Sequence, residues 1–185
     1  MIKRYERDEP FQLSRPNLIP VLVSADFLQI HSLVDHASKE AAICVDEINL
    51  SVLSRQLINK IGQYTKASQV DKIQDKDIQE AMYKQLVLNE ATKAKLFKCQ
   101  SCKCILPWAH RAQLRCLAKN VIIDKKGGIK WRHTVDSSWE FAQGQNNELS
   151  KMLDQNIKLV YWKLWGLSRI FRCTVCEQVF QVCYC

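Results

Sequence analysis

The chain has 185 residues, of which 47% are hydrophobic and 25% charged, a composition typical of folded globular proteins that excludes an intrinsically disordered chain. No apolar run approaches the roughly 18–20 residues needed to cross a bilayer, so no membrane partner is expected. Residues 1–12 are mixed in charge and lack the apolar stretch of a secretory signal, and we therefore expect an intracellular protein.

Positive charge and cysteine are both concentrated in the second half of the chain. Residues 1–98 hold 14 Lys and Arg against 13 Asp and Glu, whereas residues 99–185 hold 13 against 6, within a net charge of +8. Of the nine cysteines, only Cys44 precedes Cys99. Both shifts predict a domain boundary near residue 98. Cysteines of an intracellular chain are more often reduced ligands or core residues than disulfides.

The first half is predicted to be helical. Three of the four prolines lie in residues 10–20, which predicts an extended or turn segment there. A helix is expected next, N-capped by Ser24, because Phe27, Ile30, Val34 and Ala37 recur at helical spacing. Another is expected between Asn49 and Gly62, with the apolar stripe Leu50, Leu53, Leu57 and Ile61. Residues 67–98, rich in alternating charges, are expected to form a solvated helical connector with the thinner stripe Val70, Ile73 and Ala81.

In the second half of the chain the spacing of the hydrophobic residues changes. Residues 121–135 predict a β-hairpin, because Val121 and Ile123 alternate before the turn residues 124–128. The return strand alternates as well, through Ile129, Trp131, His133 and Val135. A helix then follows from about residue 146, with the stripe Leu149, Leu153, Ile157, Val160 and Leu164. The predicted fold class is therefore α+β, and the second half reads as cysteine knuckle, hairpin, helix and second knuckle.

Two Cys-x2-Cys pairs with matching lead-ins predict a metal site. Phe97 and Lys98 precede one pair, and Phe171 and Arg172 precede the other. Such a pair points both sulfurs at one metal, and two pairs complete the tetrahedron that Zn²⁺ prefers. Residues 103–172 separate the pairs, a loop whose closure entropy grows only logarithmically with length. We expect one structural zinc shared by Cys99, Cys102, Cys173 and Cys176, the alternatives being an iron–sulfur cluster, a redox pair or plain burial.

The remaining second-half cysteines give a weaker signal. A second metal site could combine Cys104, Cys116, Cys183 and Cys185 with His110 or His133, but no further Cys-x2-Cys spacing supports it. Core or surface positions are the favoured interpretation of these thiols. No phosphate-binding loop, nucleophile elbow, zinc-protease or zinc-deaminase motif is present, so the sequence predicts no enzyme and no small-molecule substrate.

The predicted hairpin is basic. Lys125, Lys126, Lys130 and Arg132 surround Trp131 and could contact nucleic-acid phosphates while the ring stacks on a base. The favoured alternative is a solvated hairpin tip with Trp131 packed inward, on the strand face opposite Lys130 and Arg132. The aromatic residues of "YWKLWG", Tyr161, Trp162 and Trp165, are likewise expected in the core.

Several of these stretches resemble one known family. "NLIPVLVSADFLQIHSLVDHA" resembles the C-terminal helices of a BTB (POZ) domain, through Leu22, Ala25, Leu28, Gln29, Ile30 and Leu33. "FKCQSCKCIL", "KNVIIDKKGGIKWRH" and "VYWKLWGLSRIFRCTVCEQVF" resemble, in the same order, the region that follows the BTB domain in the SANT and BTB domain regulator of class switch recombination family. The resemblance covers most of residues 10–182.

The resemblance implies a role in gene regulation. In that family the BTB domain mediates self-association and recruits other proteins, so the expected partners are a second copy of the chain and regulatory or corepressor proteins. A nuclear location is expected for the same reason. The implied domains are a partial BTB-like helical region at 1–66, the charged connector at 67–98 and a zinc-binding α+β domain at 99–185. Neither a SANT domain nor the N-terminal half of a BTB domain has a counterpart in this sequence, which leaves dimerisation open.

Overall fold

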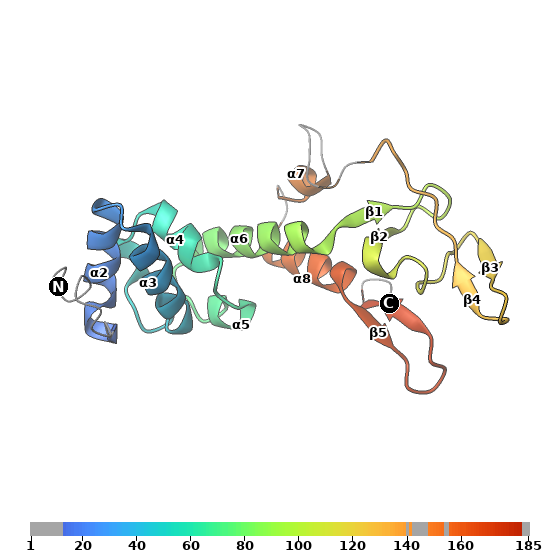
Figure 1. The fold of residues 1–185 in the computed structure, drawn as a ribbon. Helices are drawn as coiled ribbons and strands as arrows, with labels where there is room; N and C mark the ends of the chain where they lie inside the picture. Colours follow the sequence, from blue (N-terminus) through green and yellow to red (C-terminus); the bar gives the residue numbers. More distant parts are fainter. Residues whose placement is uncertain (1–12, 140, 142–147, 154–155, 183–185) are drawn as a thin grey trace. The chain divides into compact units, whose positions relative to one another are not determined.

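The computed structural model describes residues 13–139, 141, 148–153 and 156–182, and its fold class is α+β, as predicted (Figure 1). Besides the helices, the described residues form three separate two-stranded antiparallel hairpins. The chain divides into two compact units, Met1–Leu86 and Val87–Cys185, called here the N-terminal and C-terminal units. The division falls inside helix α6 (Lys76–Ala94), twelve residues before the boundary that charge and cysteine content predict.

The N-terminal unit is helical. Helices α2 (Arg15–Phe27), α3 (His31–Ile43) and α4 (Arg55–Gly62) pack in sequence, α2 on α3 and α3 on α4. The short elements η1 (Leu50–Val52) and α5 (Ala67–Val70) and the first part of α6 complete it. Its core contains the fully buried side chains Leu22, Ala37, Ala41, Ile61, Val70 and Met82.

Helix α2 begins nine residues before the predicted cap, so the expectation of an extended 10–20 segment is wrong from Arg15 onward and Ser24 lies inside the helix. Pro16 occupies the first turn, where its missing N–H is not needed, and Pro20 costs about 3 kcal/mol inside a helix. Burial of apolar side chains, about 1.5–3 kcal/mol each, outweighs that cost. Those side chains are Leu18, Val21 and Leu22.

A break at Gln29 separates α2 from α3, where the sequence predicts one continuous helix. Gln29 has φ 56°, in the left-handed region that a helix interior excludes. The apolar stripe of the next predicted helix is buried as expected, but Asn49 caps η1 and Ser54 caps α4 as two separate elements. The predicted stripe of residues 67–98 is also buried. This segment contributes more to the core than a solvated connector does, because Met82, Tyr83 and Val87 are buried too.

The C-terminal unit follows the predicted order of knuckle, hairpin, helix and knuckle. Its hairpins are β1–β2 (Leu96–Lys98, Ile105–Pro107), β3–β4 (Val121–Ile123, Ile129–Trp131) and β5–β6 (Ile170–Arg172, Val179–Gln181). The 3-10 turn η2 (Trp108–His110) follows β2. The predicted long helix is two helices, α7 (Glu148–Leu153) and α8 (Ile157–Ser168), and the Asn156 side chain caps α8.

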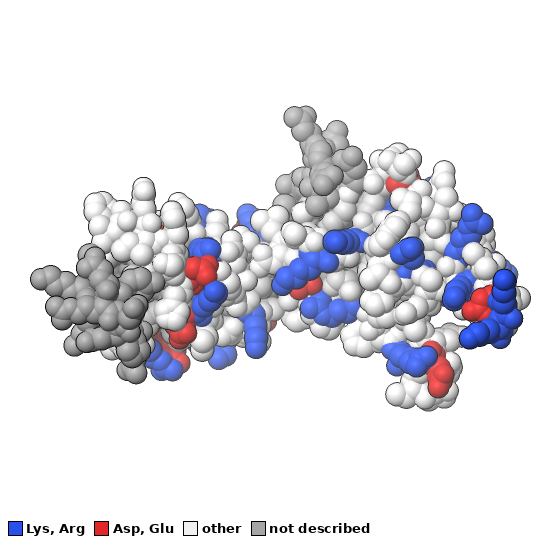
Figure 2. All heavy atoms as spheres, viewed as in Figure 1, with Lys and Arg blue, Asp and Glu red and all other residues white. Residues whose placement is uncertain are grey.

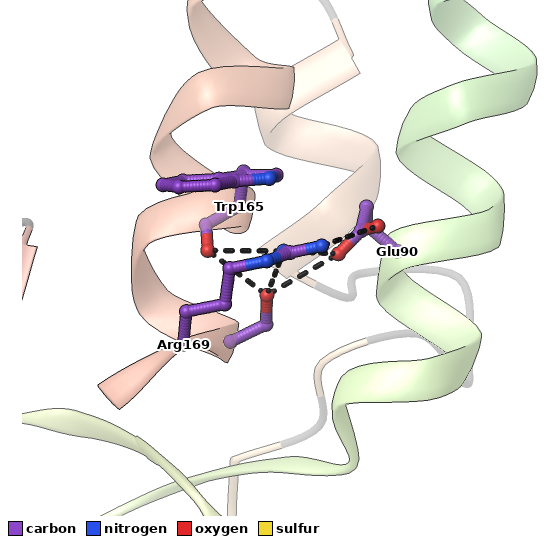
Figure 3. A network of polar contacts seen from close by, with 4 residues as sticks. Glu90, Trp165 and Arg169 are labelled. Atoms are coloured by element: carbon purple, nitrogen blue, oxygen red, sulfur yellow. Dashed lines mark hydrogen bonds and ion pairs between the residues drawn. The ribbon is translucent and has the colours of Figure 1, made fainter. Parts of the chain in front are cut away.

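A polar network fixes the end of α8 against the last turns of α6 (Figure 3). The Arg169 guanidinium donates to both carboxylate oxygens of Glu90, at 2.9 and 3.4 Å, and the Ser168 hydroxyl donates to one of them at 3.2 Å. The same guanidinium lies 4.5 Å from the Trp165 ring centroid, within cation–π range. Because α8 also contacts β2 and β6, this network holds the helix on which both knuckle hairpins pack.

Candidate metal centre

Hairpin β1–β2 presents the first cysteine pair. Its six-residue loop, 99–104, is closed by the Cys99 N–H donating to the Cys104 carbonyl at 2.9 Å and the Lys103 N–H donating to the Cys99 carbonyl at 2.8 Å. Lys103 follows the second cysteine with φ 60°, which turns the chain back into β2. The loop therefore holds Cys99 and Cys102 on one side of a tight turn.

Cys116 and His133 reach the same place from two other segments. Cys116 lies in the turn before β3, where the Lys119 N–H donates to the Cys116 carbonyl at 2.9 Å. His133 lies two residues after β4, on a segment that forms backbone hydrogen bonds with two different parts of the chain. The Gln100 N–H donates to the Thr134 carbonyl at 2.7 Å, and the Arg132 N–H donates to the Asn120 carbonyl at 3.0 Å. This segment thus ties the knuckle to the Cys116 turn.

The four ligand atoms of Cys99, Cys102, Cys116 and His133 all lie within 4.8 Å of one another. Cys99 and Cys116 are fully buried and the other two are half-buried. The distance from Cys102 Sγ to His133 Nδ1 is 3.8 Å, close to the roughly 3.6 Å that tetrahedral zinc geometry gives for one sulfur and one nitrogen. These residues fit a zinc ion.

The orientation of the His133 ring supports the same conclusion. Its Nε2 lies 3.0 Å from the Leu114 carbonyl oxygen, which can only accept, so Nε2 carries the proton. The lone pair of the neutral ring is then on Nδ1, the atom that faces the three sulfurs. Metal-ligating histidines are usually oriented by such a bond from the second ring nitrogen.

The three thiols differ in proton affinity. Burial alone would raise the pKa of Cys99, but hydrogen bonds, chiefly from the Cys102 and Ser101 N–H groups, lower that pKa to about 6. Burial raises the pKa of Cys102 and of Cys116 above the ordinary thiol value. The lowered pKa favours the thiolate of Cys99, the form that binds zinc, and binding by all three sulfurs releases protons from Cys102 and Cys116.

The described residues bring together one predicted cysteine pair and leave the other apart. Cys99 and Cys102 group with Cys116 and His133, whereas Cys173 and Cys176 lie on the loop of β5–β6 and are not members of that group. Cys104 points its thiol at the Cys102 carbonyl, 3.5 Å away, and packs against the core. His110 lies in η2 and is not a member either. Cys183 and Cys185 lie outside the described residues.

A small hydrophobic cluster surrounds the centre. Phe97, Leu106 and Leu114 pack with the two buried cysteines, and Trp131 lies against them. Ile170 and Val179 of β5–β6 pack on the same cluster, so the second knuckle hairpin is docked beside the first. Trp131 is half-buried with the Arg115 guanidinium 5.9 Å from its ring centroid, in line with the inward orientation expected for it.

The basic residues of β3–β4 are all exposed. Figure 2 shows Lys and Arg side chains gathered over this hairpin, with acidic atoms among them. Lys130 pairs with Asp124 at 3.4 Å, while Lys125 and Lys126 lie in the turn and Arg132 follows β4. Asp124 also shapes the turn, accepting from the Lys126 and Gly128 N–H groups. These four residues form a solvated surface, separate from the half-buried Trp131.

No model of a known protein family matches the chain, and no solved structure matches it. Among the described helices, none has the length and apolar character needed to span a membrane.

Proposed function

We propose that the chain is a non-catalytic protein-interaction module of a BTB-type nuclear regulator, with a C-terminal unit stabilised by structural zinc. Residues 1–66, within the N-terminal unit, form the partial BTB-like region, which self-associates and recruits regulatory or corepressor proteins. The observation that carries the zinc-stabilised part of the proposal is the Cys3His ligand set beside an exposed basic hairpin.

The donor set supports a structural role for zinc. Catalytic zinc sites keep one position for water or substrate, whereas structural sites fill all four positions with protein ligands. Three sulfurs and one imidazole nitrogen fill the tetrahedron, and two of the sulfurs are fully buried. A zinc ion held in this way stabilises the fold and performs no reaction.

Exposed apolar side chains on α2 support self-association. Phe27 is 85% exposed and Val23, one helical turn before it, is 44% exposed. Val23 and Phe27 lie four residues apart on the same helix face, and the 46% exposed Leu28 follows at the helix end. Exposed apolar side chains gathered at one end of a helix are typical of protein interfaces.

Replacing Phe27 with serine is expected to weaken self-association at least tenfold in Kd. The reason is that an aromatic anchor at an interface commonly contributes more than about 1.4 kcal/mol, which is a factor of ten. Light scattering and sedimentation across a concentration series measure the change. Leu159→Ser is the matched control, because Leu159 is 68% exposed on α8 in the other unit. A wild-type chain that stays monomeric at every concentration would contradict the self-association part of the proposal.

The exposed basic hairpin favours a second candidate, a zinc-stabilised module that binds nucleic-acid phosphates. Lys125, Lys126, Lys130 and Arg132 supply the charge, while the half-buried Trp131 has less surface to offer a base. Binding by these residues would be insensitive to sequence and steeply weakened by salt.

The charge-reversal variant Lys125→Glu/Lys126→Glu tests this candidate. If the hairpin binds phosphates, affinity for duplex and single-stranded DNA at low salt falls by more than tenfold and the salt slope decreases by about two. Fluorescence anisotropy over a salt series measures both. Lys84→Glu, a single charge reversal on α6 in the N-terminal unit, is the control. No binding by the wild type at low salt would remove the candidate.

A further inference from the structure

A pocket of about 460 Å³ lies at the base of the β3–β4 hairpin, a size within the roughly 300–1,000 Å³ of small-ligand sites. Its lining residues are Lys119, Asn120, Val121, Ile122, Arg132 and Thr134. His133, between two of them, faces the sulfurs of the metal centre instead. Side chains of an extended segment alternate in this way, so the pocket and the metal centre lie on opposite sides of the same segment.

The polar part of the lining is suited to an anion. It offers two cations, one amide and one hydroxyl, and no carboxylate. Among the described residues, neither Lys119 nor Arg132 forms an ion pair, whereas Lys130 on the same hairpin pairs with Asp124 at 3.4 Å. A guanidinium can donate two parallel hydrogen bonds to a phosphate, and an ammonium group binds one as a point charge.

Backbone hydrogen bonds hold the residues of this pocket in place. The Lys119 N–H donates to the Cys116 carbonyl at 2.9 Å, and Lys119 has φ 57°, which turns the chain into β3. The Arg132 N–H donates to the Asn120 carbonyl at 3.0 Å. The Thr134 carbonyl accepts from the Gln100 N–H at 2.7 Å. The two cations therefore extend from fixed backbone, which lowers the entropy lost when they bind a ligand together.

The surroundings of the pocket favour a nucleic-acid backbone as the source of the anion. Lys125, Lys126 and Lys130 are exposed further along the same hairpin, where Figure 2 shows basic side chains gathered. A nucleic acid carries a row of phosphates, so one phosphate in the pocket leaves its neighbours to these lysines. A single phosphorylated side chain would use the pocket and leave the lysines without a phosphate.

We propose that this pocket binds one backbone phosphate of a nucleic acid, held by Lys119 and Arg132 with Asn120 and Thr134 as further donors. The inference rests on the second candidate function and gives the basic hairpin a defined phosphate site. A contact of this kind fixes the register of the protein on the nucleic acid and carries no sequence information.

The first measurement is a titration of the full chain with inorganic phosphate at constant ionic strength, followed by backbone amide chemical shifts. We expect saturable shifts confined to residues 119–122 and 132–134. Arg132→Gln should weaken binding about tenfold, because hydrogen bonds to charged groups contribute at least that factor. Lys93→Gln, which removes one exposed charge from α6 in the same unit, is the control and should bind like the wild type. An unchanged zinc content in each variant shows that the metal centre is intact.

The second measurement asks whether DNA uses the same pocket. In fluorescence anisotropy with a short DNA duplex, Arg132→Gln should lower the affinity and reduce the salt slope by about one. At fixed ionic strength, added inorganic phosphate should weaken DNA binding by the wild type more than added chloride does. This additional competition should be absent in Arg132→Gln, because the phosphate then has no pocket to occupy.

Three results would overturn the inference. Phosphate shifts that spread equally over Lys125, Lys126 and Lys130, or that persist unchanged in Arg132→Gln, show a general attraction of anions. DNA binding that is insensitive both to Arg132→Gln and to phosphate removes the pocket and leaves the second candidate function standing. Saturable phosphate binding without DNA binding rejects the nucleic acid and that candidate together, and competition by a phosphoserine peptide would then identify a protein as the source of the phosphate.

Discussion

Replacing Cys116 with serine is expected to remove one zinc ion and to unfold the C-terminal unit. The cysteine is fully buried and provides one of four ligands, so its loss leaves an open, three-ligand site in the core. Structural zinc sites contribute roughly 10–16 kcal/mol of apparent binding free energy to folding, more than the whole stability of a small domain. Strong chelators should have the same effect on the wild-type chain.

Zinc analysis together with amide hydrogen exchange measures this outcome. Protection should be lost in β1–β2 and β3–β4 and retained in α2, α3 and α4, which belong to the other unit. Cys104→Ser is the matched control, because Cys104 lies five residues from Cys99 on the same loop and its thiol points at a carbonyl. A folded Cys116→Ser chain with unchanged zinc content would refute the assignment of Cys116 as a ligand.

Glu90→Gln is expected to destabilise the C-terminal unit by about 1–3 kcal/mol. The Glu90 side chain is only 13% exposed and accepts from Arg169 and Ser168, so the change leaves a guanidinium without its counter-charge. Breaking a fully buried pair costs about 3–5 kcal/mol, and the 39% exposure of Arg169 reduces this through solvent screening. Denaturant unfolding, monitored by amide hydrogen exchange of α8, measures this loss of stability.

A second substitution shows whether the pair itself is responsible. Arg169→Met alone should also destabilise, and Glu90→Gln/Arg169→Met should cost less than the sum of the two single changes, because the groups interact directly. Lys130→Gln is the control within the same unit, since its ion pair with Asp124 is exposed and 3.4 Å long and should leave the midpoint unchanged. Strict additivity of the two single changes would contradict a coupled pair.

The parts of the fold that could be predicted are those that local chemistry determines. The turn at residues 124–128 could be predicted from the sequence, because Asp and Gly favour a hairpin turn by themselves. In the structure the Asp124 carboxylate accepts from the Gly128 N–H, and Gly127 has φ 78°. The start of α2 could not be predicted, because Pro16 and Pro20 locally disfavour a helix. The helix becomes favourable only through the burial of Leu22 and its neighbours in the folded unit. The break at Gln29 likewise follows from the packing of α2 on α3.

The candidate metal centre was half predictable for a similar reason. Cys99 and Cys102 are a local pair, whereas Cys116 and His133 join them through chain crossings that have no short-range signature. One signal was available: thirteen residues, 103–115, separate Cys102 from Cys116, near the usual spacing between zinc-ligand groups, against seventy before Cys173. The prediction chose Cys173 and Cys176 instead, because the same Phe-basic dipeptide precedes both cysteine pairs. The two loops do share their backbone conformation, but Cys173 and Cys176 are not part of the Cys3His group.

The proposed resemblance to BTB-type regulators stays a prediction, and self-association of Phe27 variants is its direct test. The zinc centre and the resemblance are independent of one another. The Cys3His group is a feature of the fold, whereas the resemblance lies in sequence stretches of both units.

The shortness of the three hairpins has a consequence for how the C-terminal unit folds. Each strand has three residues and each hairpin closes a local loop, so these pairs can form within about 1–10 μs. The Cys99–Cys102 loop can therefore form its half of the zinc site from local contacts alone, while Cys116 and His133 join it from segments further along the chain. Metal capture at the first knuckle would then be the nucleating event, and refolding rates should depend on zinc concentration more than on the substitution of distant core residues.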